Sequence, residues 1–184
     1  LLLTSMALWA DKRPNILFFL VDDMGIGDTS VPFLYKDGES QKIEFNDLYR
    51  TPNMAKLAES GRIFTNAYSY SVCSPTRISL MTGQSAPRHR VTTWTHPKQS
   101  SIDTGLVKTG GIRSPADWRV RGLDHSLPLL PRLMKQTGYR TIFAGKAHFG
   151  PDDTPSGDPT NLGFDVNIAG FGGGGPGSYW GKYN

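Results

Sequence analysis

The sequence predicts an α/β fold in which a mostly parallel sheet is sandwiched between helices. Residues 16–21 (Ile-Leu-Phe-Phe-Leu-Val) form an unbroken apolar run of strand length, which is typical of a strand covered on both faces. Strand-like and helix-like segments then alternate along the chain, as they do in parallel α/β folds. Only a few strands can be recognised, whereas sheets commonly have about 4–6. We therefore expect the sheet to be incomplete in this chain.

The first predicted helix begins at Thr51–Pro52, because Thr51 can cap a helix and Pro52 suits its first position. Its apolar residues recur at helical spacing until Gly61, a common helix terminator. Residues 63–67 then predict a short strand.

The second half of the chain predicts two further helices and a strand. The segment after Cys73 predicts a helix to about Met81, closed by Gly83. Residues 127–136 predict another helix, and residues 140–144 predict the strand that follows it.

The composition is that of a soluble globular domain, with 184 residues of which 38% are hydrophobic and 20% charged. Residues 88–121 are rich in Lys and Arg and contain only two acids, Asp103 and Asp117. This segment either faces an anionic substrate or is an ordinary solvated surface. It lacks the dense basic and aromatic pattern of nucleic-acid binders, so we expect no nucleic-acid partner. Residues 92–122 have weak periodicity and predict a long surface excursion.

Residues 1–10 form an apolar run that ends before the polar segment beginning at Asp11. The run resembles the end of a signal peptide whose basic start is missing, and it predicts a periplasmic or secreted protein. A buried strand or helix is the alternative. Because a bilayer needs roughly 20 apolar residues, we expect no membrane span. The single cysteine, Cys73, cannot form an internal disulfide, so it is either a buried filler or a reactive group.

The first candidate site is the pair Asp22–Asp23, directly after the predicted strand at residues 16–21. Ligands gather at the carboxyl ends of strands in open α/β sheets. Adjacent carboxylates there suit a hard divalent cation such as Ca²⁺ or Mg²⁺. A solvated acidic turn is the alternative. Asp28 fits a third ligand or a turn equally well.

The second candidate site combines Cys73 and Arg77. Cys73 lies at the start of a predicted helix, where backbone N–H groups and the helix dipole favour negative charge. Arg77 is four residues further on and returns to the same helix face. The pair suits the handling of an oxyanion, and a small buried cysteine with a surface arginine is the alternative.

The third candidate site is Lys146 and His148, directly after the strand predicted at residues 140–144. In an extended chain, residues two apart point to the same side, so a cation and an imidazole would be presented together. Imidazole is well suited to proton transfer near neutral pH. We expect the remaining histidines to be surface or structural residues: His89, His96 and His125.

Five segments in order resemble the formylglycine-dependent sulfatases of the alkaline-phosphatase-like superfamily. The most specific is Cys73-Ser74-Pro75-Thr76-Arg77 with Leu80, Thr82 and Gly83, which matches the signature C-x-P-S/T-R…L-x-T/S-G. The others are residues 13–25, 51–68, 138–150 (G-Y-x-T…G-K-x-H-x-G) and 162–165 (L-G-F-D). The resemblance covers most of the chain, from Arg13 to about Asp165.

The resemblance implies an alkaline-phosphatase-like fold and the hydrolysis of sulfuric esters. It implies that Cys73 is oxidised to formylglycine by a formylglycine-generating or equivalent maturation enzyme. Asp22 and Asp23 would bind Ca²⁺ in preference to Mg²⁺, joined by an oxygen of the modified Cys73.

The resemblance also implies roles for the basic residues. Arg77 would hold the modified cysteine and the metal site in place. Lys146 would neutralise sulfate oxygens, and His148 would hydrogen-bond a formylglycine hydroxyl.

The chemistry explains why a modified cysteine is needed. A hydrated aldehyde carries two hydroxyls on one carbon. One attacks sulfur and displaces the alcohol, and the second then loses its proton and expels sulfate as the aldehyde re-forms. An unmodified Cys or Ser has no second hydroxyl, so its sulfated form would need slow direct hydrolysis.

The chain departs from the family pattern in two respects. Ala147 stands where the family commonly has Trp, which affects packing more than chemistry. The family also takes further metal ligands and a second Lys and His from well downstream, and nothing before Asn184 supplies them. We therefore expect residues 1–10 to be a residual signal peptide and residues 11–184 the N-terminal portion of a catalytic domain, inactive alone.

The substrate and two alternatives complete the sequence-based interpretation. By family analogy, the expected substrate is a sulfate ester of a carbohydrate, a sulfated glycan. The first alternative is a phosphodiesterase or phosphonate monoester hydrolase of the same superfamily, since some of these share the C-x-P-x-R nucleophile. The second is a non-catalytic binding fragment in which Cys73 is never modified.

Overall fold

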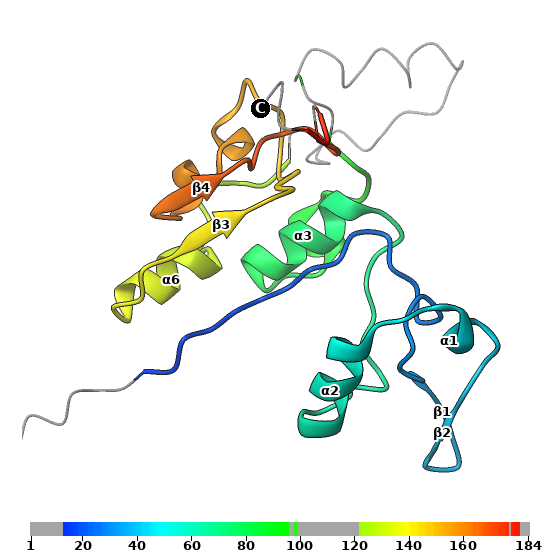
Figure 1. Cartoon of the computed structure of the whole chain (residues 1–184). Helices are drawn as coiled ribbons and strands as arrows, with labels where there is room; N and C mark the ends of the chain where they lie inside the picture. Colours follow the sequence, from blue (N-terminus) through cyan, green and yellow to red (C-terminus); the bar gives the residue numbers. More distant parts are fainter. Residues whose placement is uncertain (1–12, 96–97, 99–121, 177, 181–184) are drawn as a thin grey trace, which may run out of the picture. The chain divides into compact units, whose positions relative to one another are not determined.

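The computed structural model describes residues 13–95, 98, 122–176 and 178–180, and the chain divides into two compact units, Leu1–Ile63 and Phe64–Asn184 (Figure 1). The predicted signal peptide at residues 1–10 and most of the excursion predicted at residues 92–122 lie outside the described residues. Among the described residues, no helix has the length and apolar character needed to cross a membrane.

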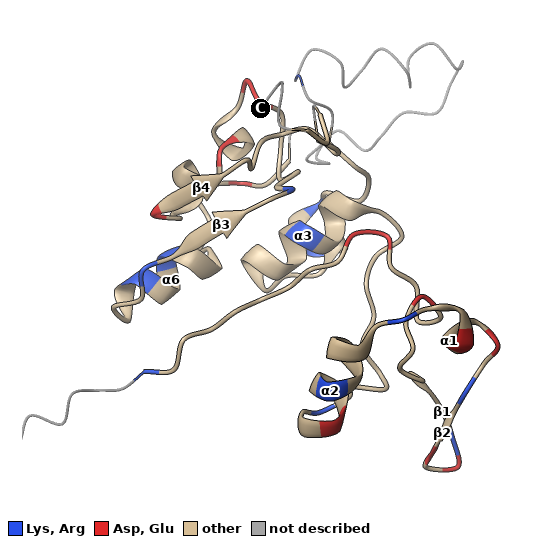
Figure 2. Cartoon of the chain, viewed as in Figure 1, with Lys and Arg blue, Asp and Glu red and all other residues tan. Residues whose placement is uncertain are grey.

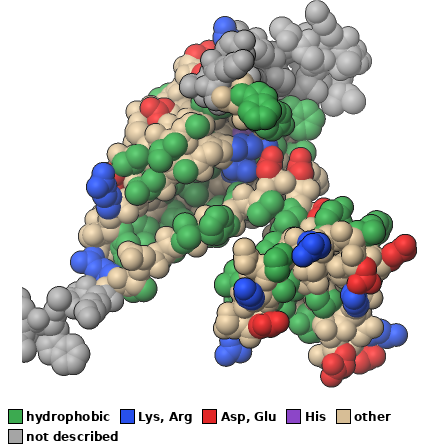
Figure 3. Space-filling model, viewed as in Figure 1, with side chains coloured by type: hydrophobic (Ala, Val, Ile, Leu, Met, Phe, Trp, Pro, Cys, Tyr) green, Lys and Arg blue, Asp and Glu red, His purple; other side chains and the backbone are tan. Residues whose placement is uncertain are grey.

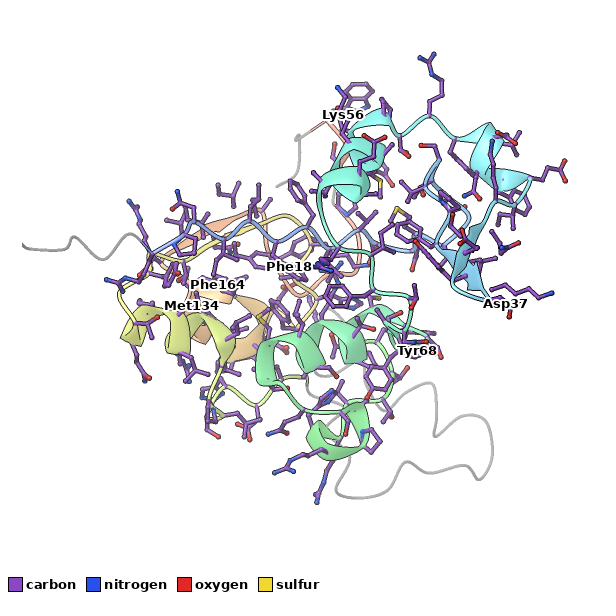
Figure 4. The ribbon with its side chains drawn as sticks, turned by 90° about the horizontal axis from the view of Figure 1, so that it is seen from below. Phe18, Asp37, Lys56, Tyr68, Met134 and Phe164 are labelled. Carbon is purple, nitrogen blue, oxygen red and sulfur yellow. The ribbon has the colours of Figure 1, made fainter. Side chains whose placement is uncertain are left out.

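The first unit contains a β-hairpin followed by two helices. The hairpin consists of the antiparallel strands β1 (Leu34–Lys36) and β2 (Glu39–Gln41). It is followed by the helices α1 (Phe45–Leu48) and α2 (Pro52–Ser60). The turn residues Asp37 and Gly38 both have positive φ angles, 53° and 86°. Asp-Gly favours such a turn because both residues tolerate the left-handed region. The hairpin was not predicted, although this dipeptide, with Asp37 labelled in Figure 4, is its strongest local signal.

Polar side chains hold the first unit together. The buried Asn46 donates from Nδ2 to the carbonyls of Thr29 at 2.8 Å and Val31 at 3.2 Å. Helix α2 begins where the sequence predicts, but the Thr51 side chain does not cap it. Instead, the Thr51 hydroxyl oxygen accepts the backbone N–H of Ser30 at 2.9 Å. The predicted cap residue therefore ties the start of α2 to an earlier loop.

The two strands predicted at residues 16–21 and 63–67 are wrong for this structure. Neither segment has strand pairing, and the six apolar side chains of residues 16–21 are between 40% and 80% exposed. A strand obtains its hydrogen bonds only from a neighbouring strand, so an apolar pattern predicts burial without supplying the partner. Hydrophobic side chains are accordingly visible at the surface in Figure 3.

The second unit contains the parallel strand pair. Its elements are α3 (Cys73–Thr82), α4 (Ala86–His89), α6 (Leu130–Gln136), β3 (Ile142–Ala144), two short 3₁₀ helices η2 (Pro155–Gly157) and η3 (Pro159–Leu162), and β4 (Val166–Ile168). Strand β3 pairs in parallel with β4, and Phe143 lies opposite Asn167. Strand β3 lies inside the predicted range, whereas β4 was not predicted because three residues carry too little periodicity.

The two predicted helices of this unit are confirmed. Helix α3 begins at Cys73, and Gly83 ends it in the left-handed region (φ 65°) by donating its N–H to the carbonyl of Ser79 at 2.8 Å. Helix α6 begins three residues later than predicted and ends at Gln136, as predicted.

One hydrophobic core lies within the second unit. Its buried members are Ile78, Met81, Val91, Leu123, Leu129, Ala147, Phe149 and Leu162. Phe143 packs edge-to-face against Phe149 and Phe164, with ring centroids 5.6 Å and 5.2 Å apart (Phe164 is labelled in Figure 4). The core therefore packs α3, which carries Ile78, against the segment after β3, which carries Ala147.

Candidate active site

Asp22 and Asp23 are exposed residues of the first unit and form a turn. Asp23 has a φ angle of 53°, a left-handed conformation that is unusual outside glycine. Asp28 closes the following turn, since its Oδ2 accepts the N–H of Gly25 at 2.7 Å and its own N–H donates to the Gly25 carbonyl at 3.1 Å. The structure therefore favours the turn interpretation for Asp28. In the ranges that the structure describes, no three His, Cys, Asp or Glu residues are grouped as a metal site.

Cys73 is the first residue of α3 and is partly exposed as a free thiol. The Thr76 hydroxyl holds the chain just before it: its oxygen accepts the N–H of Tyr70 at 3.0 Å, and it donates to the carbonyl of Val72 at 3.3 Å. The threonine of the signature thus folds back onto the loop that leads into the helix. These two contacts hold the backbone just before the cysteine to the first turn of the helix.

Arg77 is buried, with 6% of its surface exposed, so the alternative of a surface arginine is wrong. Its Nη1 donates to the backbone carbonyl of Lys146 at 2.6 Å. Because Arg77 lies on α3, one turn after Cys73, this bond holds the Lys146 segment to the helix that carries the cysteine. In the second unit, the ribbon of Figure 2 is coloured for Lys or Arg on both α3 and α6.

Ser74 makes a second connection from α3 to the same segment. It is fully buried, and its hydroxyl donates to the carbonyl of His148 at 3.0 Å. Its oxygen also accepts the backbone N–H of Thr95 at 3.0 Å. Ser74 and Arg77 are three residues apart and so lie on one face of the helix. Together they bind the carbonyls of Lys146 and His148, on either side of the buried Ala147.

His148 is 4% exposed, and its Nε2 lies 2.8 Å from the carbonyl oxygen of Thr95. Its backbone is left-handed, with a φ angle of 53°, so the extended alternation expected for Lys146 and His148 does not hold at this residue. The backbone N–H of His148 donates to the carbonyl of Phe171 at 3.1 Å. Strained backbone of this kind persists where surrounding contacts determine it, and it occurs often at functional sites.

The glycine-rich segment near the end of the described chain borders the His148 ring. A Cβ placed on Gly174 would lie 2.9 Å from Cε1 and 3.3 Å from Nδ1 of His148. A Cβ on the next residue, Gly175, would meet nothing within 4 Å. Glycine at position 174 therefore allows the backbone to approach the imidazole closely.

His89 is a structural histidine, as predicted. It is buried, its Nε2 lies 2.9 Å from the Ser79 hydroxyl, and its Nδ1 accepts the N–H of Val91 at 3.2 Å. An acceptor nitrogen carries no proton, so Nε2 donates to Ser79 in the neutral ring. Burial lowers the pKa of His89 below its usual value, because desolvation disfavours the charged form. His125 is exposed, and His96 lies outside the described residues.

Asp165 joins α6 to the parallel strands. Its carboxylate pairs with Lys135 at 2.7 Å and accepts the N–H of Thr141 at 2.8 Å. The hydrogen bond from Lys135, followed by that from Thr141, lowers the pKa of Asp165 to about 2. The family's G-F-D segment therefore ends on a residue that anchors the start of β3 in this structure.

The structure thus brings four of the predicted site residues into one unit: Cys73, Arg77, Lys146 and His148. It connects them through Ser74 and Thr95, which were not predicted as functional residues. Ser74 occupies the variable position of the C-x-P-S/T-R signature, so no pattern marks it. Its role depends on a neighbour 74 residues away, which only the folded chain reveals.

Comparisons with known proteins identify relatives of the chain as a whole. The sequence model of the sulfatase family matches residues 14–177. The chain is 34% identical to N-acetylgalactosamine-6-sulfatase of Homo sapiens over 177 residues, 95% of this chain and 28% of that protein. It is 31% identical to arylsulfatase D of Homo sapiens over 160 residues, 83% of this chain and 22% of that protein. The crystal structure of Ps i-CgsB matches with a TM-score of 0.50 and 28% identity, covering 78% of this chain and 25% of that chain.

The structural match confirms the predicted fold class, an alkaline-phosphatase-like α/β fold that is partial in this chain. Because the family model matches almost all of it, the chain belongs to the sulfatase family. It spans 28% of the length of human N-acetylgalactosamine-6-sulfatase.

Proposed function

We propose that this protein is a sulfuric ester hydrolase whose nucleophile is a formylglycine derived from Cys73. The observation that supports this most directly is the position of Cys73. It is the first residue of α3, the helix that holds Lys146 and His148 through Arg77 and Ser74. Backbone N–H groups at a helix start favour the negative charge of a sulfuryl group.

Each basic residue has a distinct role in the proposal. Lys146 is partly exposed, and its ammonium group would neutralise sulfate oxygens. His148 hydrogen-bonds the modified residue 73. Arg77 is buried and acts by holding the Lys146 backbone. A hydrated formylglycine would supply two hydroxyls on one carbon, the first as nucleophile and the second to expel sulfate.

Asp22 and Asp23 are the proposed ligands of a divalent cation, with an oxygen of the modified Cys73 as a third. Two adjacent exposed carboxylates fit a hard cation chemically, and family analogy favours Ca²⁺ over Mg²⁺. They provide fewer than the six to eight oxygens that Ca²⁺ takes, so further ligands are required. The cation would supply electrostatic stabilisation of the developing charge.

The remaining features of the proposal follow from family analogy. The substrate is a sulfate ester of a carbohydrate, a sulfated glycan, and residues 11–184 belong to the catalytic domain. Maturation requires a formylglycine-generating or equivalent enzyme. Such maturation suits an exported protein, periplasmic or secreted, which the apolar residues 1–10 also support.

The test begins with a tryptic peptide mass around Cys73, in full-length protein expressed with a formylglycine-generating system. Loss of the thiol and gain of an aldehyde that a hydrazine reagent traps are the expected results. Turnover of an aryl sulfate is then compared with turnover of an aryl phosphate diester. Preference for the diester would replace the proposal with a phosphodiesterase or phosphonate monoester hydrolase. An unmodified thiol in well-folded protein would support a non-catalytic binding role.

A further inference from the structure

We propose that Ser74 and Thr95 are positioning residues that hold His148 as its Nε2–H tautomer, so that Nδ1 is the nitrogen through which His148 acts at the reacting centre. This inference deepens the proposed function, because it rests on the assignment of His148 to the site. The inference specifies which ring nitrogen of His148 acts in the reaction, and it names Ser74 and Thr95 as the residues that determine this.

The first step is the contact between the imidazole and the Thr95 backbone. Nε2 of His148 lies 2.8 Å from the Thr95 carbonyl oxygen, a normal hydrogen-bond distance. A carbonyl oxygen can only accept, so Nε2 must carry the proton. In the neutral ring the lone pair is then on Nδ1. The hydrogen bond that a histidine makes through one ring nitrogen thus determines whether the other nitrogen is protonated.

The second step is the rigidity of that carbonyl. Thr95 is 2% exposed, and its backbone N–H donates to Ser74 Oγ at 3.0 Å. The hydroxyl oxygens of Ser74 and Thr95 are also 3.3 Å apart. The same Ser74 hydroxyl donates to the carbonyl of His148 at 3.0 Å. One buried oxygen therefore connects the backbone of Thr95 to the backbone of His148 and sets the position of the ring relative to its acceptor.

The third step is the covalent link to the proposed nucleophile. Ser74 follows Cys73 directly on α3, so the residue that positions His148 is bonded to the residue that reacts. Movement of either would be transmitted to the other. The left-handed backbone of His148 is a conformation that such contacts must maintain.

The fourth step concerns the alternative nitrogen. If His148 acted through Nε2, it would have to give up the Thr95 bond inside a buried environment. A buried carbonyl that loses its donor is not compensated by water, so breaking this bond is unfavourable. Action through Nδ1 keeps that bond in place, and an imidazolium formed there would still donate from Nε2 to Thr95. Gly174 borders the ring at Cε1 and Nδ1, and a Cβ there would lie 2.9 Å and 3.3 Å from these atoms, so glycine keeps a side chain out of contact with the Nδ1 edge.

The test is long-range ¹H–¹⁵N correlation NMR on the full-length protein labelled with ¹⁵N-histidine, near pH 8. The signals that disappear in the His148→Gln variant are assigned to His148. We expect the Nε2–H pattern for His148 in the wild-type protein. An Nδ1–H pattern, or fast averaging between the two, would overturn the proposal. Because this readout needs no turnover, it stands even if the proposed hydrolysis is not found.

Two variants test the role of the serine. Ser74→Ala should broaden or average the His148 tautomer signals and lower kcat by roughly 10- to 100-fold, as losses of orienting partners do, with KM little changed. The control is Ser79→Ala, which makes the same chemical change on the same helix but breaks a contact to His89. It should leave the His148 tautomer and kcat unchanged. An equal effect of both variants would show that Ser74 is merely structural and would contradict its positioning role.

Discussion

Arg77 and Lys146 are 69 positions apart in the chain, yet Nη1 of the arginine lies 2.6 Å from the carbonyl oxygen of the lysine. The arginine therefore contacts the backbone of a second basic residue through this bond. Arg77 is only 6% exposed, and a buried cation is costly unless it is hydrogen-bonded, so this bond offsets part of the cost of burying it.

We expect Arg77→Lys to destabilise the fold and to impair the site. A lysine cannot reproduce the planar guanidinium, and the carbonyl of Lys146 would lose its donor. The free energy of unfolding should fall by about 1–3 kcal/mol. Turnover of an aryl sulfate by the full-length protein should fall by more than the unfolded fraction explains. Arg88→Lys, at an exposed position on α4, is the control and should alter neither quantity.

Gly174→Ala should perturb His148, whereas Gly175→Ala should not. The added Cβ at position 174 would lie 2.9 Å from the His148 ring, closer than carbon atoms pack, and the ring is buried. Overpacking of this kind costs about 1–3 kcal/mol. Chemical denaturation and the His148 NMR signals measure the two effects. Equal behaviour of the two variants would mean that the glycine-rich segment does not approach the ring in solution.

The sequence predicted the helix that begins at Cys73 better than it predicted the sheet. A helix makes its hydrogen bonds within one segment, so Cys73 as a starting residue and Gly83 as a terminator could be identified locally. Strand β4 has only three residues and depends on its pairing with β3. The apolar pattern at residues 16–21 is equally clear in the sequence, but it cannot show whether a neighbouring strand is present.

The sequence predicted the types of residue in the candidate site, but it did not predict the hydrogen bonds that connect them. The signature and the Lys146–His148 pair identify residue types that suit an anionic ester. The contacts of Ser74 span 21 and 74 residues, and no local pattern encodes a pairing over such distances. The buried position of Arg77 also depends on the packed core, so its bond to a backbone carbonyl could not be foreseen.

His89 should make the stability of the protein fall in mildly acidic solution. Its pKa is below the usual 6.5 in the folded state because the ring is buried, so the unfolded chain binds more protons below that pH. The stabilisation is complete above about pH 6.5 and is lost as the pH falls toward the folded pKa. Thermal unfolding between pH 8 and pH 5 should show a steeper decline for the wild-type protein than for His89→Gln. Parallel curves would contradict the assignment.

Asp165 should act in a more acidic range. Its folded pKa of about 2 lies below the usual 3.8, so its contribution to stability is present above about pH 4 and is lost as the pH falls toward 2. Asp165→Asn removes the charge that pairs with Lys135, and the variant should lose less stability over this interval. Denaturant titrations at pH 5, 4 and 3 measure the difference. Lys135→Met should flatten the pH dependence in the same direction, because it removes the main cause of the shift.

The carboxylates of Asp22, Asp23 and Asp28 provide a matched set of substitutions for testing calcium binding. Asp22→Asn and Asp23→Asn should each weaken the stabilisation of the full-length protein by added Ca²⁺, since each removes a charged ligand. Asp28→Asn changes a carboxylate of the same loop that the structure assigns to a turn on Gly25, so it should leave the calcium response intact. The measurement is the shift in melting temperature between excess chelator and a calcium titration. If all three variants keep the wild-type response, Asp22 and Asp23 do not bind the metal. If Asp28→Asn alone abolishes it, the ligand assignment within this loop must be reversed.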